Sequence, residues 1–306
     1  MKYLTLLLLI LFIILFPLAQ VSFSTTNNSY LVINHKSNIV IKGMRLQNIT
    51  IINSHNIIIE GNIINSSSSL FGISIYNSSN IVIEGNTIYN IHFDGINIQS
   101  SKNIVIIGNN ISFNDGDGIT LWDNTFNVTI SNNIISGNGY GVFILLSGYV
   151  NVFNNFLLNS SYYGIYLYQA YNVRIYNNTI SFNDAGIEID YANMVDILYN
   201  TISYNKVGIY LGDGIYNLSL LYNIISYSSY FGLLIHYYPT IFISKDNVFI
   251  SSLQFYDYEK VNTTVIKVVS PTINGNQGVK ALQHIVYYLL VITIIITIFI
   301  VMKKRR

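Results

Sequence analysis

Two groups of residues in this sequence have types and spacings that could do chemistry. The first is acidic: Asp94 directly precedes Gly95, and Asp117 directly precedes Gly118, with Asp115 two residues earlier. If these stretches stack, their carboxyl groups repel one another unless a cation or a proton joins them. Ca²⁺ accepts such oxygen clusters, with backbone carbonyls completing its shell. We therefore expect either a Ca²⁺ site or an ordinary solvated acidic bend.

The second group combines aromatic rings with carboxylates, two and four places after a recurring glycine. Flat rings beside carboxylates are suited to holding sugars. On this basis the sequence predicts an exposed ligand-binding face made of Trp122, Phe143, Tyr166, Tyr168, Glu188, Asp190 and Tyr210. The alternative is that tyrosine, of which the chain has 26, simply favours strands.

Glu188 and Asp190 are the weak catalytic candidates on this face. Ile187 and Ile189 must point into a core, so the alternation forces both carboxylates outward. The two residues lie roughly 7 Å apart at the backbone, between the separations typical of retaining and inverting glycosidases. Hydrolysis therefore stays open, although the sequence shows no sign of the raised pKa that a general acid needs.

Several other chemistries are excluded or disfavoured by composition. The chain has no cysteine, which excludes disulfides and thiolate metal sites. Its five histidines are scattered, without the spacing of metal ligands. The net charge is +1, but five of the 15 basic residues lie near the two ends of the chain, so no basic patch is left for nucleic acid. The expected cofactors are therefore none, apart from the possible Ca²⁺.

A unit of about 23 residues repeats along the chain and must position these groups. One marker is a glycine followed by a branched apolar residue, expected at a bend with positive φ: Gly72, Gly95, Gly118, Gly141, Gly164, Gly186, Gly208 and Gly232. The other is an asparagine, expected at a left-handed bend where its amide bonds to the asparagines above and below: Asn62, Asn86, Asn109, Asn133, Asn155, Asn178, Asn200, Asn223 and Asn247.

Between the markers, β-branched residues alternate with polar ones, as in short strands. Three strands per unit predict an all-β, right-handed parallel β-helix of about nine to ten coils, with each strand paired to its equivalent one coil on. A column of Ile, Val and Leu would fill the centre of such a solenoid.

Over residues 38–250 this pattern resembles the pectate-lyase-like right-handed β-helix superfamily. The short coils look like those of the NosD-like group of carbohydrate-binding proteins and sugar hydrolases, here as an archaeal-type surface protein. The resemblance implies the fold and a link to carbohydrates. It does not extend to the catalytic motifs of polygalacturonases, which are absent. The nearest fragment of their Arg-Ile-Lys motif is Arg174-Ile175, which is followed by Tyr176 instead of lysine.

Apolar segments flank the repeats. Residues 1–24 resemble a secretory signal peptide cleaved near Ser24 or Ala19, with an uncleaved anchor as the alternative. Residues 25–250 form the predicted β-helix, with 25–55 as its first, capping coil, and 251–284 form a second cap and stalk. Residues 285–302 are long enough to span a bilayer, and the basic tail 303–306 places that end inside the cell. We therefore expect a type I single-pass protein with an extracellular β-helix.

We expect the exported β-helix to be N-glycosylated, and the best acceptors are Asn27, Asn65, Asn77, Asn159 and Asn262. The leading functional prediction is a non-catalytic surface module that binds polysaccharide or an envelope glycoprotein. One alternative is a polysaccharide lyase or glycoside hydrolase, and another is a purely structural envelope component.

Overall fold

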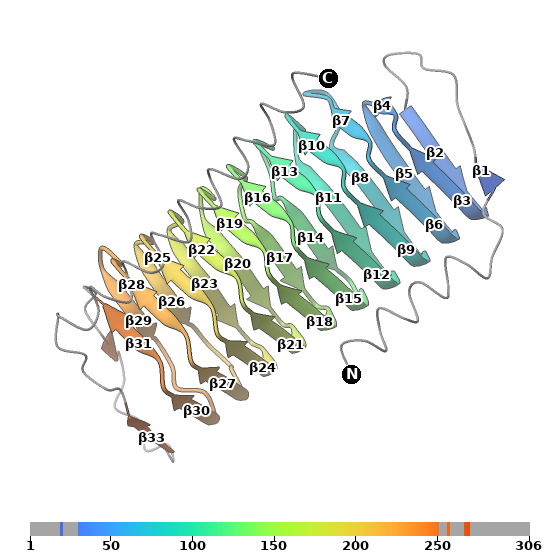
Figure 1. The fold of residues 1–306 in the computed structure, drawn as a ribbon. Helices are drawn as coiled ribbons and strands as arrows, with labels where there is room; N and C mark the ends of the chain where they lie inside the picture. The colour runs from blue at the N-terminus through green and yellow to red at the C-terminus, as the bar shows by residue number, and fades with distance from the viewer. Residues whose placement is uncertain (1–18, 21–29, 251–255, 258–265, 270–306) are drawn as a thin grey trace. The chain divides into compact units, whose positions relative to one another are not determined.

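The computed structural model describes residues 19–20, 30–250, 256–257 and 266–269. Its strands form three parallel sheets that run side by side along a solenoid (Figure 1). Each strand pairs with the equivalent strand of the next coil, as the repeat predicts. The predicted signal peptide, stalk, transmembrane helix and basic tail lie largely or wholly outside the described residues.

The 12-stranded sheet contains, in order, β1 (Ala19–Gln20), β3 (Ser37–Lys42), β6 (His55–Glu60), β9 (Ser79–Glu84), β12 (Lys102–Ile107), β15 (Phe126–Ser131), β18 (Gly148–Phe153), β21 (Tyr171–Tyr176), β24 (Asn193–Leu198), β27 (Asn217–Leu221), β30 (Ile241–Lys245) and β33 (Ile266–Val269). The 10-stranded sheet contains the short strands β4 (Arg45–Leu46), β7 (Ile63–Asn65), β10 (Thr87–Tyr89), β13 (Asn110–Ser112), β16 (Ile134–Ser136), β19 (Phe156–Leu158), β22 (Thr179–Ser181), β25 (Thr201–Ser203), β28 (Ile224–Ser226) and β31 (Val248–Ile250).

The 11-stranded sheet carries the predicted ligand-binding residues. Its strands are β2 (Tyr30–Asn34), β5 (Asn48–Ile52), β8 (Phe71–Tyr76), β11 (Asp94–Gln99), β14 (Ile119–Trp122), β17 (Val142–Leu145), β20 (Tyr163–Tyr168), β23 (Ala185–Asp190), β26 (Val207–Leu211), β29 (Phe231–Ile235) and β32 (Tyr256–Asp257). The predicted capping region belongs to the regular pairing, because Tyr30 is in register with Asn48 and Ile49 with Ile73.

Columns of branched side chains fill the interior. Ile73, Ile96 and Ile119 stack in consecutive coils and are fully buried, and equivalent columns rise from the other two sheets. In most coils the outward residues that alternate with the core positions are partly exposed, so the period-two pattern of the sequence matches the two faces of each strand. This continuous core holds the outward side chains of successive coils at a regular spacing of about 4.8 Å.

The nine marker asparagines form a continuous buried ladder. The side-chain amide of each donates to the Oδ1 of the next, for example from Asn109 to Asn133 at 3.0 Å and from Asn133 to Asn155 at 3.0 Å. The same Oδ1 accepts from the backbone N–H of the preceding asparagine, at 2.9 Å for Asn133 and Asn109. The ladder thus satisfies polar groups beside an isoleucine core, where unpaired groups would be costly.

The conformational reasons expected for the two markers are corrected by the structure. The positive φ falls on the residue before each ladder asparagine, as at Gly61 and Asn132, and not on the asparagine itself. The recurring glycines have no positive φ either. A Cβ on Gly72 would lie 2.6 Å from the carbonyl oxygen of Gly95 and 2.7 Å from the Ile88 side chain. Glycine is therefore needed there because neighbouring coils approach closely.

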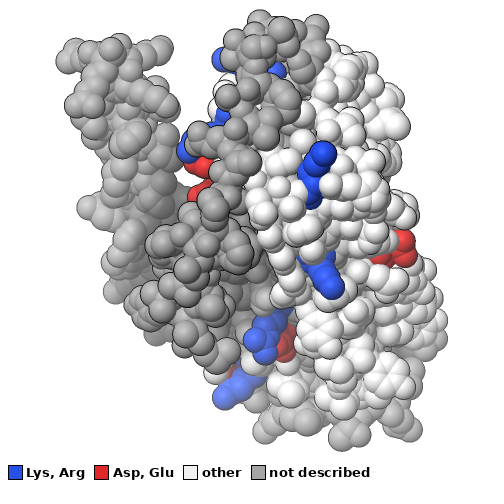
Figure 2. Space-filling view, turned by 90° about the vertical axis from the view of Figure 1, so that its right-hand side faces the viewer, with Lys and Arg blue, Asp and Glu red and all other residues white. Residues whose placement is uncertain are grey.

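Charged residues are sparse on the surface. The view in Figure 2 shows scattered Lys, Arg, Asp and Glu among uncharged residues. Within the part of the chain that the structure describes, no helix has the length and apolarity needed to cross a membrane.

Candidate functional site

The predicted ligand-binding residues lie on the outer face of the 11-stranded sheet. One column runs through Phe143, Tyr166, Glu188 and Tyr210, each in register with the next. The neighbouring column places Tyr168 in register with Asp190, and Trp122 beside Gln99 in earlier coils. The stacking deduced from the repeat therefore agrees with the observed register.

The aromatic rings of this face pack against one another and are half-buried, where the sequence suggested an exposed stripe. Phe143 and Tyr166 are stacked with ring centroids 5.0 Å apart and an interplanar angle of 6°. The ring centroid of Tyr140 lies 5.3 Å from that of Phe143 and 5.4 Å from that of Tyr163. Tyr140 and Tyr163 were not among the predicted site residues, although both hold the position directly before the recurring glycine that also carries Asp94 and Asp117.

Glu188 is buried against these rings, with 7% of its surface exposed. Burial raises the pKa of the Glu188 carboxyl to about 7, and the nearby charge of Asp190 adds to the rise. A hydrogen bond from the Tyr163 hydroxyl opposes the shift without cancelling it. The Glu188 carboxyl therefore retains its proton to a much higher pH than an ordinary glutamate, which no feature of the sequence indicated.

Asp190 completes the group and is partly exposed. Its Oδ2 accepts from the Tyr166 hydroxyl at 3.3 Å, and its Oδ1 accepts from the backbone N–H of Asp213 at 3.0 Å. Burial, followed by the charges of Glu188 and Asp190, raises the pKa values of Tyr163 and Tyr166. Both phenols therefore stay protonated as donors.

We call Tyr140, Phe143, Tyr163, Tyr166, Glu188 and Asp190 the tyrosine–acid cluster.

Asp94 and Asp117 lie on the same sheet face in earlier coils and are engaged by protein donors. Asp94 is 1% exposed, and its carboxylate accepts from the Asp117 backbone N–H at 2.9 Å and from Asn97 Nδ2 at 2.8 Å. Asp117 accepts from the Tyr140 backbone N–H at 2.9 Å and from Thr120 Oγ1 at 3.1 Å. Burial raises the pKa of both carboxyls, that of Asp117 to about 6.

Asp115, the third residue of the predicted Ca²⁺ site, is not brought to the other two. It is well exposed, and its Oδ2 lies 3.5 Å from His92 Nδ1. Among the described residues, no group of three or more His, Cys, Asp or Glu side chains is placed to hold a metal ion. The buried Asp94 and the partly buried Asp117 instead connect successive coils by accepting backbone N–H groups.

The remaining predicted residues extend the face on both sides of the cluster. Trp122 donates its indole N–H to Asn97 Oδ1 at 3.2 Å. Tyr168 lies edge to face with Tyr191, with ring centroids 5.6 Å apart. Both side chains are partly exposed.

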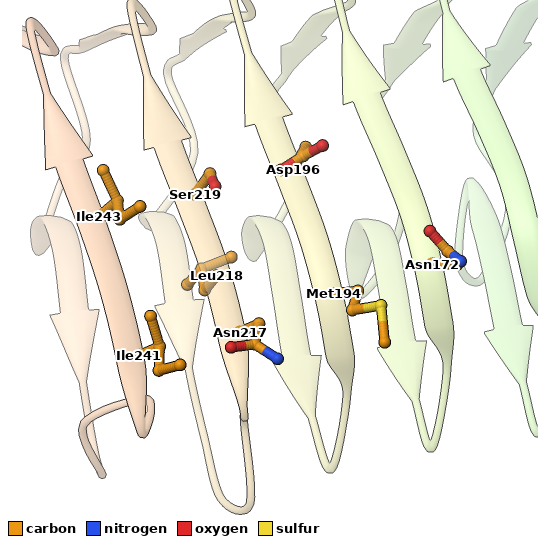
Figure 3. A pocket seen from close by; sticks show the side chains of 8 residues that line it. All are labelled: Asn172, Met194, Asp196, Asn217, Leu218, Ser219, Ile241 and Ile243. Carbon is orange, nitrogen blue, oxygen red and sulfur yellow. The ribbon is translucent and has the colours of Figure 1, made fainter.

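A pocket of about 240 Å³ lies elsewhere, on the outer face of the 12-stranded sheet (Figure 3). Its lining comes from β21, β24, β27 and β30 and consists of Asn172, Met194, Asp196, Asn217, Leu218, Ser219, Ile241 and Ile243. None of the predicted ligand-binding residues belongs to it.

Three of the predicted glycosylation acceptors fall within the described residues. Asn65, Asn77 and Asn159 are all exposed, as an acceptor must be. Asn27 and Asn262 lie outside the described residues.

Solved structures of low sequence identity share this fold. The A-module of a mannuronan C-5 epimerase from Azotobacter vinelandii superimposes with a TM-score of 0.65 at 16% identity, covering 83% of this chain and 80% of that one. For an exopolygalacturonase from Thermotoga maritima the TM-score is 0.63 at 11% identity, with 74% and 81% covered. For a tailspike protein of an Escherichia coli O157:H7 bacteriophage it is 0.58 at 13% identity, with 76% and 38% covered.

No curated protein sequence matches the chain significantly. The sequence does match the family described as the right handed beta helix region, in three overlapping stretches, residues 23–157, 71–225 and 121–283. These matches span most of the chain and agree with the parallel coils and the stacked asparagines. The chain therefore belongs to the right-handed β-helix family.

Proposed function

We propose that this protein binds polysaccharide along the outer face of the 11-stranded sheet. The observation that carries the proposal is the tyrosine–acid cluster, where packed rings lie directly beside two carboxylates. Rings offer flat apolar surfaces to sugar rings, and carboxylates accept hydrogen bonds from sugar hydroxyls. The protein core holds both, so little entropy is lost when a ligand binds.

The comparisons support the same direction. The similar structures include a mannuronan epimerase and an exopolygalacturonase, whose names denote work on polysaccharides. The coil spacing of about 4.8 Å is of the same order as the length of one sugar unit, so an extended chain could contact equivalent positions on successive coils.

Titration of the purified full-length chain with neutral, amino and acidic oligosaccharides tests this proposal, with Trp122 fluorescence as the readout. We expect Tyr168→Ala to weaken binding by up to roughly tenfold, because stacking on an aromatic ring is worth about 0.5–1.5 kcal/mol. Tyr149→Ala is the matched control, since Tyr149 is an exposed tyrosine on the 12-stranded sheet. If no glycan binds, the purely structural role becomes the better interpretation.

Catalysis is the second candidate, and the Glu188 pKa of about 7 favours it. A carboxyl group that titrates near neutral pH is suited to act as general acid or base. Asp190, two residues along the same strand, would then be the partner carboxylate of a hydrolase, or Glu188 would act as the base of a lyase.

Assays for new reducing ends and for unsaturated products separate binding from catalysis. Glu188→Gln keeps an acceptor for the Tyr163 hydroxyl while removing the titratable proton. In an enzyme it should abolish turnover and leave oligosaccharide affinity nearly unchanged. If the wild-type chain binds a glycan without cleaving it under any condition, the non-catalytic role stands.

We further propose that the β-helix is exported, N-glycosylated and anchored by residues 285–302. The apolar run, the basic tail behind it and the exposed Asn65, Asn77 and Asn159 support this placement. Protease added to intact cells should then remove the β-helix and spare the tail. Cleavage of the tail alone would reverse the proposed topology.

A further inference from the structure

The charges of the 11-stranded sheet indicate which class of glycan its outer face would take. None of its described strands contains a lysine or an arginine. The same strands contribute Asp94, Glu188 and Asp190. Lys206, just before β26, contacts the Asp184 carboxylate at 2.6 Å. A polyuronate, with a carboxylate on every sugar, would meet the partly exposed Asp190 above the buried Glu188 carboxyl, and no basic residue of the described strands would offset the repulsion.

The aromatic part of the face favours the opposite charge. The rings of Tyr140, Phe143 and Tyr166 lie within 5.5 Å of one another, centroid to centroid. Ring faces attract ammonium groups, and the attraction strengthens when water is excluded. Asp190 is in direct contact with the Tyr166 hydroxyl, so a cation against these rings would also meet a carboxylate.

Glu188 has no positively charged partner among the described residues. Its carboxyl is buried beside Tyr163 and Asp190, and no cation among the described residues offsets the cost of ionising it. On the 12-stranded sheet, by contrast, Glu60 and Asp196 are each paired with a basic side chain. An ammonium group from outside the chain would fill the same role for Glu188 and Asp190.

We propose that the ligand of this face is an amino-bearing glycan, with its ammonium groups against the Tyr140–Phe143–Tyr166 rings and the Asp190 carboxylate. This inference rests on the proposed function and specifies its substrate class. Because Asp117 and Glu188 lie three coils apart, roughly 14 Å at the standard spacing, several consecutive sugars would contact the face.

Three oligosaccharides of equal length test the inference on the full-length chain. Glucosamine oligomers carry free amines, their N-acetylated twins are neutral, and galacturonate oligomers are anionic. At mildly acidic pH, where the amines are protonated, we expect the glucosamine oligomers to bind roughly tenfold more tightly than the acetylated twins. This preference should shrink as salt is added, and galacturonate oligomers should bind most weakly.

Asp190→Asn should reduce the preference for the amine, while its amide oxygen can still accept the Asp213 N–H. Glu84→Gln, an exposed acid on the 12-stranded sheet, is the matched control and should leave the preference intact. Equal binding of the amine and acetylated oligomers would overturn the amino-glycan inference and leave polysaccharide binding standing. So would tighter binding of galacturonate. If none of the three oligomers binds, both proposals fail.

Discussion

Carboxylates hold equivalent outward positions on two sheets of the same solenoid, yet they lie in opposite settings. On the 12-stranded sheet, Glu60 Oε1 is 2.8 Å from Lys42 Nζ, and Asp196 Oδ2 is 3.2 Å from Arg174 Nε. Both acids remain partly exposed. On the 11-stranded sheet, Glu188 and Asp94 are buried and have neutral partners, tyrosine hydroxyl, amide and backbone N–H.

This difference arises from the residue one coil away. Lys42 is in register with Glu60, and Arg174 with Asp196, so each acid gains a cation that leaves it solvated. Tyr166 is in register with Glu188, so that acid gains a ring that excludes water. In a parallel solenoid the stacked neighbour thus contributes to whether a carboxylate is a solvated surface charge or a buried group with a raised pKa.

Removing a buried acid should have the largest effect. Asp94→Ala leaves the Asp117 N–H and the Asn97 amide without their acceptor, so we expect a loss of about 2–5 kcal/mol in the free energy of unfolding. Asp94→Asn, which keeps an acceptor oxygen, should lose less. Urea denaturation followed by circular dichroism measures both. Equal and small losses would mean that water replaces the carboxylate without cost.

The pH dependence of stability should come next in size. The carboxyls of Asp117 and Glu188 have native pKa values of about 6 and about 7, above those of an unfolded chain. The native state therefore binds more protons between about pH 4 and pH 7, and stability falls as pH rises through this interval.

For Glu188 this loss amounts to about 2–3 kcal/mol, complete above its native pKa. Melting temperatures across this pH range should show the decline, and Glu188→Gln should remove the part between pH 5 and 7. Glu60→Gln serves as the control on the other sheet. If the dependence of melting temperature on pH is the same in Glu188→Gln as in the wild type, the Glu188 carboxyl is solvated and its pKa is not raised in the native state.

A cation placed beside Glu188 should convert this buried carboxyl, which has only neutral partners, into a cation-paired carboxylate like Glu60. Tyr166→Lys puts an ammonium in register with Glu188, as Lys42 is with Glu60. We expect the pKa of Glu188 to fall by about 1–2 units toward the ordinary glutamate value. Carbon-13 NMR titration of the carboxyl carbons would measure it. Tyr168→Lys, one column away, should lower the pKa of Glu188 less. If the pKa of Glu188 is unchanged in Tyr166→Lys, the residue in register one coil away does not control it.

Breaking an exposed pair on the 12-stranded sheet should have the smallest effect. Glu60→Gln removes the charge that faces Lys42, and surface pairs of this kind contribute about 0–1 kcal/mol. The loss should shrink further at high salt. If Glu60→Gln lowers the free energy of unfolding as much as Asp94→Ala, measured by the same denaturation, then the carboxylates of the two sheets do not differ in their contribution to stability.

The repeat, the strand class and the stacking partners were determined by the sequence alone. In a parallel solenoid the register follows from spacing, so a period of about 23 residues already places Asn109 above Asn133 and Tyr166 beside Glu188. Alternation likewise separates core isoleucines from outward residues. The same local rules do not reveal how closely the coils approach, so they explain the recurring glycines by positive φ, whereas the structure explains them by contact with the next coil.

What only the tertiary structure decided is the environment of the outward side chains. Asp115 follows Asn114 and precedes Gly116 in a bend, and its direction toward His92 depends on that bend's path. Glu188 is hydrogen-bonded by Tyr163, and Tyr163 packs on Tyr140; both tyrosines come from other coils, just before the recurring glycine. Exposure and pKa depend on the summed surroundings in space, whereas a pattern along one chain records only which residue stacks on which.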